Sequence, residues 1–228
     1  MISALKPYVG NALWVVAIAI GLVATGGVIA NLPKRDRGAE QAQIGNPSVG
    51  KAPGNVGRGT PLEPAGANQL AIFGQGCFWG VEERFRRVPG VVATAVGYTG
   101  GRTERPRYED VSGGATRHVE AVLVEFDPRR VRYEELLRFF WQTHDPTSGN
   151  AQGPDRGTQY RSAIYSFGPE QLTAALASRA EEQKQLIEPI TTEIAAAGPF
   201  WLAEPEHQQW DEKRGVRSCP VPQRPRRK

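Results

Sequence analysis

A chain of 228 residues is long enough for one well-cored domain with extensions but short for two. Many of its 26 glycines and 18 prolines lie near the two ends, so low-complexity flanks are expected around a single folded part. The net charge of +4 owes much to a basic, proline-rich tail over residues 220–228, so this charge does not indicate a nucleic-acid partner.

The first notable segment, residues 13–32, is strongly apolar and has no charged side chain. About 20 such residues can cross a bilayer as a helix, and a position so near the start also fits a secretory signal cleaved after Ala30. Residues 1–32 are therefore predicted to be a signal peptide or a membrane anchor. We expect a membrane-anchored or exported (periplasmic or extracytoplasmic) domain. Positive charges on both sides of the segment leave a cytoplasm-facing anchor open.

Residues 33–68 have almost no large apolar side chains and many glycines and prolines. Such a stretch cannot bury enough surface to order itself, which predicts a disordered linker. The folded domain is expected over residues 69–219.

Hydrophobic periodicity predicts the order of elements in this domain. Strands are expected at 69–73, 91–98, 118–126, 161–167 and 190–194, and helices at 77–87, 133–142 and 169–185. The core order β-α-β-β-α-β is that of the split βαβ arrangement, an α/β (α+β) two-layer sandwich with a ferredoxin-like core and helices on one face of the sheet. Along 118–126, alternation places Glu120 on the same face as Val122, Val124 and Phe126.

The chemistry is predicted to lie in Gly76-Cys77-Phe78-Trp79-Gly80. A strand before this run and a helix after it place Cys77 at a helix amino terminus, where unsatisfied N–H groups and the helix dipole favour an anion. The thiol should therefore ionise more readily than an ordinary one, which argues against an inert core cysteine. A dinucleotide-binding turn is excluded, because the third glycine comes one residue late and bulky side chains fill the space of a pyrophosphate.

The other cysteine, Cys219, lies in a tail-like segment of Arg, Gly, Ser and Pro. A structural disulfide with Cys77 is one reading, and export would favour it. It would leave a reactive thiol idle, so an attacking and resolving pair is the favoured interpretation. The histidines His118, His144 and His207 show no zinc-ligand spacing with either cysteine, and each is expected to be a surface or hydrogen-bonded residue.

Residues 69–219 resemble the peptide-methionine sulfoxide reductases of the A class. The resemblance begins at the Cys77 motif and continues through ordered blocks: Pro89-Gly90-Val91, Gly97-Tyr98-Thr99-Gly100-Gly101, Pro106-Arg107-Tyr108, His118-Val119-Glu120-Ala121-Val122, Phe140-Trp141, His144-Asp145-Pro146, Gly157-Thr158-Gln159-Tyr160-Arg161-Ser162, Gly198-Pro199-Phe200 and His207-Gln208-Gln209. It implies a two-layer α/β fold and reduction of the S epimer of methionine sulfoxide, free or in proteins.

The resemblance also implies roles for individual residues. Cys77 attacks the sulfoxide sulfur and Glu120 donates a proton to the oxygen, a role that fits an apolar strand face because desolvation raises the pKa of a carboxyl group. Cys219 resolves the sulfenic acid. The implied substrate-binding residues are Phe78 and Trp79 around the methyl group, Tyr108 and Tyr160 at the oxygen, and Asp155, which shapes the site.

The resemblance implies no metal, flavin or nucleotide, a thioredoxin-like dithiol as the external reductant, and a monomer. The chain departs from the family at Ser112, near which the family often has an extra cysteine, and at Trp210, where tyrosine is more frequent. Neither departure is expected to touch the chemistry. A thiol peroxidase or redox sensor could use the same cysteine pair but has no use for an aromatic methyl pocket. A non-catalytic binding module on the same scaffold is a further alternative.

Overall fold

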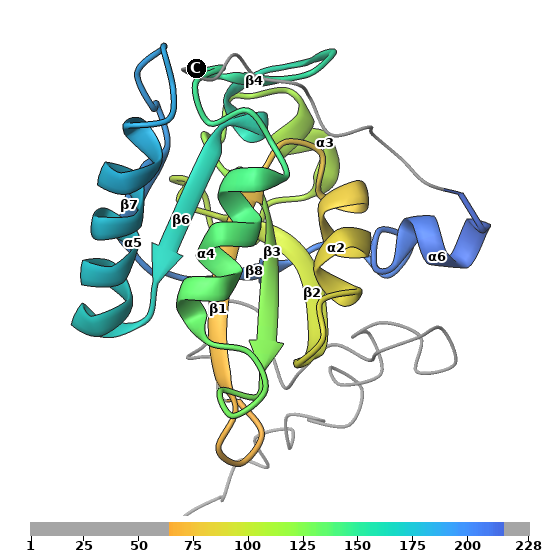
Figure 1. Ribbon diagram of the computed structural model, residues 1–228. Coiled ribbons are helices and arrows are strands. Elements are labelled where there is room, and N and C mark those ends of the chain that lie inside the picture. Colours follow the sequence, from red (N-terminus) through yellow and green to blue (C-terminus); the bar gives the residue numbers. More distant parts are fainter. Residues whose placement is uncertain (1–63, 217–228) are drawn as a thin grey trace, which may run out of the picture. The chain divides into compact units, whose positions relative to one another are not determined.

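The computed structural model describes residues 64–216 (Figure 1). Its first half contains strand β1 (Gln69–Gln75), helix α2 (Phe78–Arg86), strand β2 (Val91–Thr99), helix α3 (Tyr108–Ser112), strand β3 (Val119–Phe126) and helix α4 (Tyr133–Gln142). Then follow β4 (Ala151–Gln152), β5 (Asp155–Arg156), the 3-10 helix η1 (Thr158–Tyr160), β6 (Ser162–Ser166), α5 (Gly168–Gln183), β7 (Glu193–Ala196), β8 (Trp201–Leu202) and α6 (Trp210–Arg214).

The main sheet has the strand order β7-β6-β1-β3-β2-β8. Pairing is antiparallel between all neighbours from β6 through β1, β3 and β2 to β8, whereas β7 is parallel to β6. Along the chain these four strands alternate with α2 and α4 in the β-α-β-β-α-β order that periodicity predicts, with α3 inserted between β2 and β3. The predicted α/β class, a sheet with helices, is confirmed.

Each face of the sheet has its own apolar core. Helices α2 and α4 cover the face that carries Val122, Val124 and Phe126, as the alternation in β3 predicts (Figure 1). Phe73 lies at the centre of this layer, with its ring centroid 4.9 Å from that of Phe85. The segment between β7 and β8 runs across the other face and buries Phe200 there. Strand β3 is therefore buried on both faces, which fixes its register and the position of Glu120.

The strand predicted at 190–194 begins later, at Glu193. The backbone N–H of Thr191 donates to the Pro146 carbonyl at 2.9 Å, and that of Ile190 donates to the Gln183 side chain at 2.7 Å. Because these donors bond to the Pro146 carbonyl and to the end of α5, pairing with β6 starts only at Glu193, opposite Ala163. The short elements α3, β8 and α6 were not predicted, since five residues or fewer carry no measurable period.

Several predictions concern residues at the edge of the described range or beyond it. Residues 64–68, the end of the predicted linker, form a turn in which Ala65 N–H and the Asn68 amide donate to Glu125 at 3.0 and 2.7 Å. Within residues 64–216, no helix is long and apolar enough to cross a membrane. The signal or anchor at 1–32, the linker over 33–63, Cys219 and the tail at 220–228 lie outside the described residues, and what was predicted of them stays a prediction.

Candidate active site

Cys77 lies in the turn between β1 and α2 and is the residue that immediately precedes the helix. The turn requires Gly76, whose φ of +89° is rarely adopted by other residues, and a Cβ at this position would lie 2.6 Å from Cβ of Gln152. The absence of a side chain lets the β4–β5 hairpin pack against the turn. The Cys77 side chain is partly exposed, so a substrate can reach a thiol that faces the amino-terminal end of α2.

Glu120 is buried on β3, opposite Tyr98 of β2. Its Oε2 accepts the backbone N–H of Phe78 at 3.1 Å. This bond satisfies one of the donors that a helix start leaves without an intrahelical partner. It also fixes the Glu120 carboxyl group beside Phe78, the residue that follows Cys77. The candidate nucleophile, Cys77, and the candidate acid, Glu120, therefore both lie at the start of α2.

Phe78, Trp79 and His207 form an aromatic wall beside Cys77. The ring of Phe78 is buried, and its centroid lies 5.7 Å from that of His207. Trp79 Nε1–H donates to His207 Nδ1 at 3.1 Å, so Nδ1 of the neutral imidazole is the acceptor and Nε2 carries the proton. Burial lowers the pKa of His207, against the opposing effect of Glu204 and Glu206, which favours this neutral form. The wall is therefore largely apolar and its rings are fixed.

Two tyrosines and a carboxylate complete the site. Burial raises the pKa of Tyr160, and the nearby charges of Glu120, Asp155 and Cys77 raise it further. The pKa of Tyr108 is raised by burial and then by the same three groups. Burial also raises the pKa of Asp155. Because the effect of a charge declines with distance, the action of the same three groups on both tyrosines indicates that they all lie in one site. The raised pKa values keep both phenols protonated, so that each can donate a hydrogen bond.

Glu204 holds Tyr108 in place. One carboxylate oxygen accepts the backbone N–H of Tyr108 at 3.0 Å, and the other accepts the hydroxyl of Tyr98 at 3.0 Å. The Tyr108 ring then stacks on His207 with centroids 4.4 Å apart. Sequence reasoning missed Glu204, and it assigned His207 no role, because both follow β8 in an irregular segment without periodicity. Only the family-like block at 207–209 marked this region.

The structure brings together all but one of the predicted site residues: Cys77, Phe78, Trp79, Tyr108, Glu120, Asp155 and Tyr160. The exception, Cys219, lies outside the described residues. Trp210 was expected not to touch the chemistry, and this stays a prediction, but the residue does contact the aromatic wall. Its ring stacks on Trp79 with centroids 4.2 Å apart and 7° between planes, so it backs the proposed wall directly.

The three histidines are hydrogen-bonded, as predicted. His118 Nε2 bonds the Thr103 carbonyl at 2.8 Å, and His144 Nε2 lies 2.7 Å from the Ser162 hydroxyl. Across residues 64–216, no three His, Cys, Asp or Glu side chains are grouped so as to hold a metal ion.

Glu82, on α2, is another buried carboxyl group, and sequence reasoning gave it no role. Its oxygens accept the backbone N–H of Gln209 at 2.6 Å and the Thr94 hydroxyl at 2.9 Å. Burial raises the pKa of Glu82 to about 7, although these two bonds and the charges of Arg86 and Lys213 lower it. The group therefore titrates near neutrality.

This raised pKa predicts a pH effect on stability. The folded protein keeps the Glu82 proton to a higher pH than the unfolded chain, where glutamate titrates near 4.5, so the free energy of unfolding should fall as pH rises from 4.5 to about 7. The loss is on the order of 3 kcal/mol. Urea denaturation of the wild type and Glu82→Gln at pH 5 and pH 7.5 measures it. Buried histidines change the free energy of unfolding with pH in the opposite direction. Because they are present in both proteins, the wild type and Glu82→Gln are compared at each pH. An identical pH dependence in both would contradict the assignment.

A partly exposed thiol at a helix start, with a buried carboxyl group at the adjacent N–H and an aromatic wall beside it, is the arrangement of a thiol-dependent enzyme. Comparison with known proteins narrows this class. A model of the family described as peptide methionine sulfoxide reductase matches residues 69–228. The peptide methionine sulfoxide reductase MsrA of Salmonella arizonae is 53% identical over 163 residues, which are 69% of this chain and 76% of that protein.

Solved structures agree with the sequence relatives. Methionine sulfoxide reductase A of Corynebacterium diphtheriae is 38% identical and superposes with a TM-score of 0.62 over 74% of this chain and 85% of that one. Reduced Mxr1 of Saccharomyces cerevisiae is 32% identical, with a TM-score of 0.66 over 73% and 95% of the two chains. The chain belongs to the peptide methionine sulfoxide reductase family. It is an oxidoreductase that reduces methionine sulfoxide at the expense of thiols.

Proposed function

We propose that Cys77 is the nucleophile and Glu120 the general acid in the reduction of methionine sulfoxide. The observation that carries this proposal is the hydrogen bond from Phe78 N–H to Glu120 Oε2, since it brings a buried carboxyl group to the helix turn that presents the thiol. With Oε2 accepting this N–H, Oε1 carries the proton that the sulfoxide oxygen receives.

The substrate is held at its apolar methyl group and at its polar sulfoxide oxygen. Phe78 and Trp79 receive the methyl group, a role supported by the burial of Phe78, by the partial burial of Trp79 and by the ring contacts around them. Tyr108 and Tyr160 donate hydrogen bonds to the sulfoxide oxygen, and their raised pKa values keep both phenols protonated for it. Asp155 acts on both tyrosines and shapes this polar side. The preference for the S epimer follows from the family resemblance.

The chemical step transfers the oxygen atom from the substrate to the enzyme. The Cys77 thiolate attacks the sulfur of the protonated sulfoxide and forms a sulfur–sulfur bond to it. The hydroxyl group then passes to the Cys77 sulfur: a sulfur–oxygen bond forms on Cys77, while the sulfur–oxygen bond of the substrate and the new sulfur–sulfur bond break, which leaves a Cys77 sulfenic acid and methionine. Methionine leaves with its sulfur reduced by two electrons, and the cysteine sulfur is oxidised by two. The Cys219 thiol then attacks the sulfenic acid, a Cys77–Cys219 disulfide forms, and water leaves. A thioredoxin-like dithiol reduces the disulfide.

The resolving role is tested with Cys219→Ser. Since Cys77 can still attack, one equivalent of methionine should form per enzyme, and a sulfenic acid should accumulate until a small thiol reduces it. Turnover driven by a thioredoxin-like protein should fall sharply. Rapid-quench assay of methionine together with intact mass follows both events. Unchanged turnover with the thioredoxin-like protein would refute the role of Cys219.

A further inference from the structure

Glu82 is a buried carboxyl group that the proposed mechanism does not use. It lies on α2, one turn after Phe78, and its carboxyl group contacts β2 and the segment that leads into α6. Its two hydrogen-bond donors come from distant parts of the chain. The Thr94 hydroxyl belongs to β2, and the Gln209 N–H lies 127 residues further along the sequence.

The segment that Glu82 contacts is the part of the chain that leads to Cys219. Gln209 has a left-handed backbone, with φ of 54°, and α6 begins at the next residue. Its N–H is buried, so without Glu82 this donor would lose its acceptor at a cost that folded proteins rarely tolerate. Gln208 is fixed in a similar way, since its side chain accepts the Val96 N–H and donates to the Val96 carbonyl, each at 2.9 Å.

A second contact from α2 fixes the first turn of α6. Arg86, one turn after Glu82, is buried and binds Glu212 at 2.7 Å, and it also donates to Thr94 at 3.3 Å. Trp210 lies between Trp79 on one side and the Arg214 guanidinium on the other, which is 3.2 Å from the ring centroid. Helix α2, which begins directly after Cys77, therefore holds the start of α6 at Gln209, Trp210 and Glu212.

We propose that Glu82 is a positioning residue for the resolving step: it holds the start of α6 on α2, and so fixes the point in the chain from which Cys219, five residues after Arg214, must reach Cys77. A short tether from a fixed point raises the effective concentration of one thiol at the other, whereas a detached segment dilutes it. This inference rests on the proposed role of Cys219. Glu82 touches neither substrate nor thiol, so attack by Cys77 does not depend on it.

The test separates the two steps in Glu82→Ala and Glu82→Gln. Glu82→Ala should form its one equivalent of methionine within about twofold of the wild-type rate, while formation of the Cys77–Cys219 disulfide slows about tenfold or more. Glu82→Gln should restore disulfide formation to within about threefold, because its amide oxygen still accepts the Gln209 N–H and its amide group donates to Thr94. Glu83→Ala is the matched control, since this neighbouring carboxylate pairs with Arg87 and should leave both steps unchanged.

The rates of the two steps in these variants decide the proposal. Disulfide formation at the wild-type rate in Glu82→Ala would overturn it, and so would an equal slowing of methionine release and disulfide formation. If Glu82→Ala does not fold, Glu212→Ala decides, because it breaks the ion pair with Arg86: slower disulfide formation with an intact methionine burst supports the proposal, and unchanged disulfide formation overturns it. Absence of a Cys77–Cys219 disulfide in the wild type would refute the proposed function instead.

Discussion

Glu120→Gln should lower the rate of sulfoxide reduction by about a hundredfold or more, which is the usual effect of removing a general acid from an enzyme. The fold should survive, because the glutamine amide oxygen can still accept the Phe78 N–H that Oε2 of Glu120 accepts. The amide group can form a hydrogen bond to the sulfoxide oxygen but cannot transfer a proton to it. Steady-state kinetics with dithiothreitol and a sulfoxide, together with thiol titration and circular dichroism, measure the effect.

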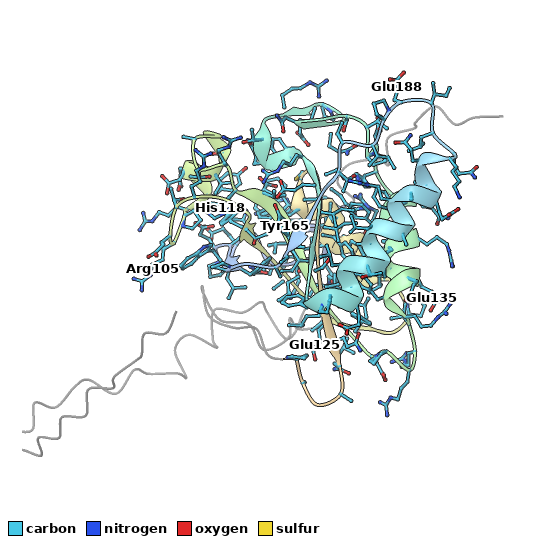
Figure 2. The ribbon with its side chains drawn as sticks, turned by 90° about the vertical axis from the view of Figure 1, so that its left-hand side faces the viewer. Arg105, His118, Glu125, Glu135, Tyr165 and Glu188 are labelled. Atoms are coloured by element: carbon cyan, nitrogen blue, oxygen red, sulfur yellow. The ribbon has the colours of Figure 1, made fainter. Side chains whose placement is uncertain are left out.

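The strand itself offers a matched control in Glu125→Gln. Glu125, which is labelled in Figure 2, is as buried as Glu120. It lies near the other end of β3, where its side chain accepts hydrogen bonds from Ala65 and Asn68. Its substitution also replaces a buried carboxyl group of β3 by an amide, so it reproduces the cost to stability without touching the helix start. We expect its activity to stay within a few-fold of the wild type. Activity of Glu120→Gln in that same range would contradict the general-acid assignment.

Local patterns were sufficient to predict the elements that carry the nucleophile. The amphipathic period of 133–142 gave both ends of α4, and the strand-turn-helix pattern around Gly76 placed Cys77 directly before α2. Alternation along β3 assigned Glu120 to the face that α2 and α4 cover. These features depend on residues that are near one another in the sequence, which is the range over which periodicity is informative.

The rest of the site depends on contacts between distant residues. Glu82 falls on the apolar face of the predicted helix, but no local pattern could reveal its acceptor role toward Gln209. Glu204 and His207 likewise hold Tyr108 and Trp79 across the fold from an irregular segment. Only the fold brings such pairs together. The residues predicted through family resemblance, apart from Cys219, lie together in the described part of the fold, because the resemblance itself carries that three-dimensional information.

Cys77→Ser should release no methionine, even in a single turnover. A serine hydroxyl at this helix start remains neutral near pH 7, so it presents no nucleophile comparable to the thiolate that the helix end favours. The variant should keep its fold, because serine is among the preferred residues before the first turn of a helix and its oxygen can accept an N–H of α2. A thermal midpoint equal to or above that of the wild type would therefore accompany complete loss of activity.

Rapid-quench measurement of methionine during the first turnover, at enzyme concentrations comparable to that of the substrate, provides the test. Cys219→Ser is the control, because it also replaces one cysteine by serine yet should give one equivalent of methionine in the same experiment. Intact mass then separates the two proteins, since a gain of one oxygen is expected only where Cys77 is present. A methionine burst from Cys77→Ser would mean that another group attacks the sulfoxide, and the assignment of the thiol at the start of α2 as nucleophile would be wrong.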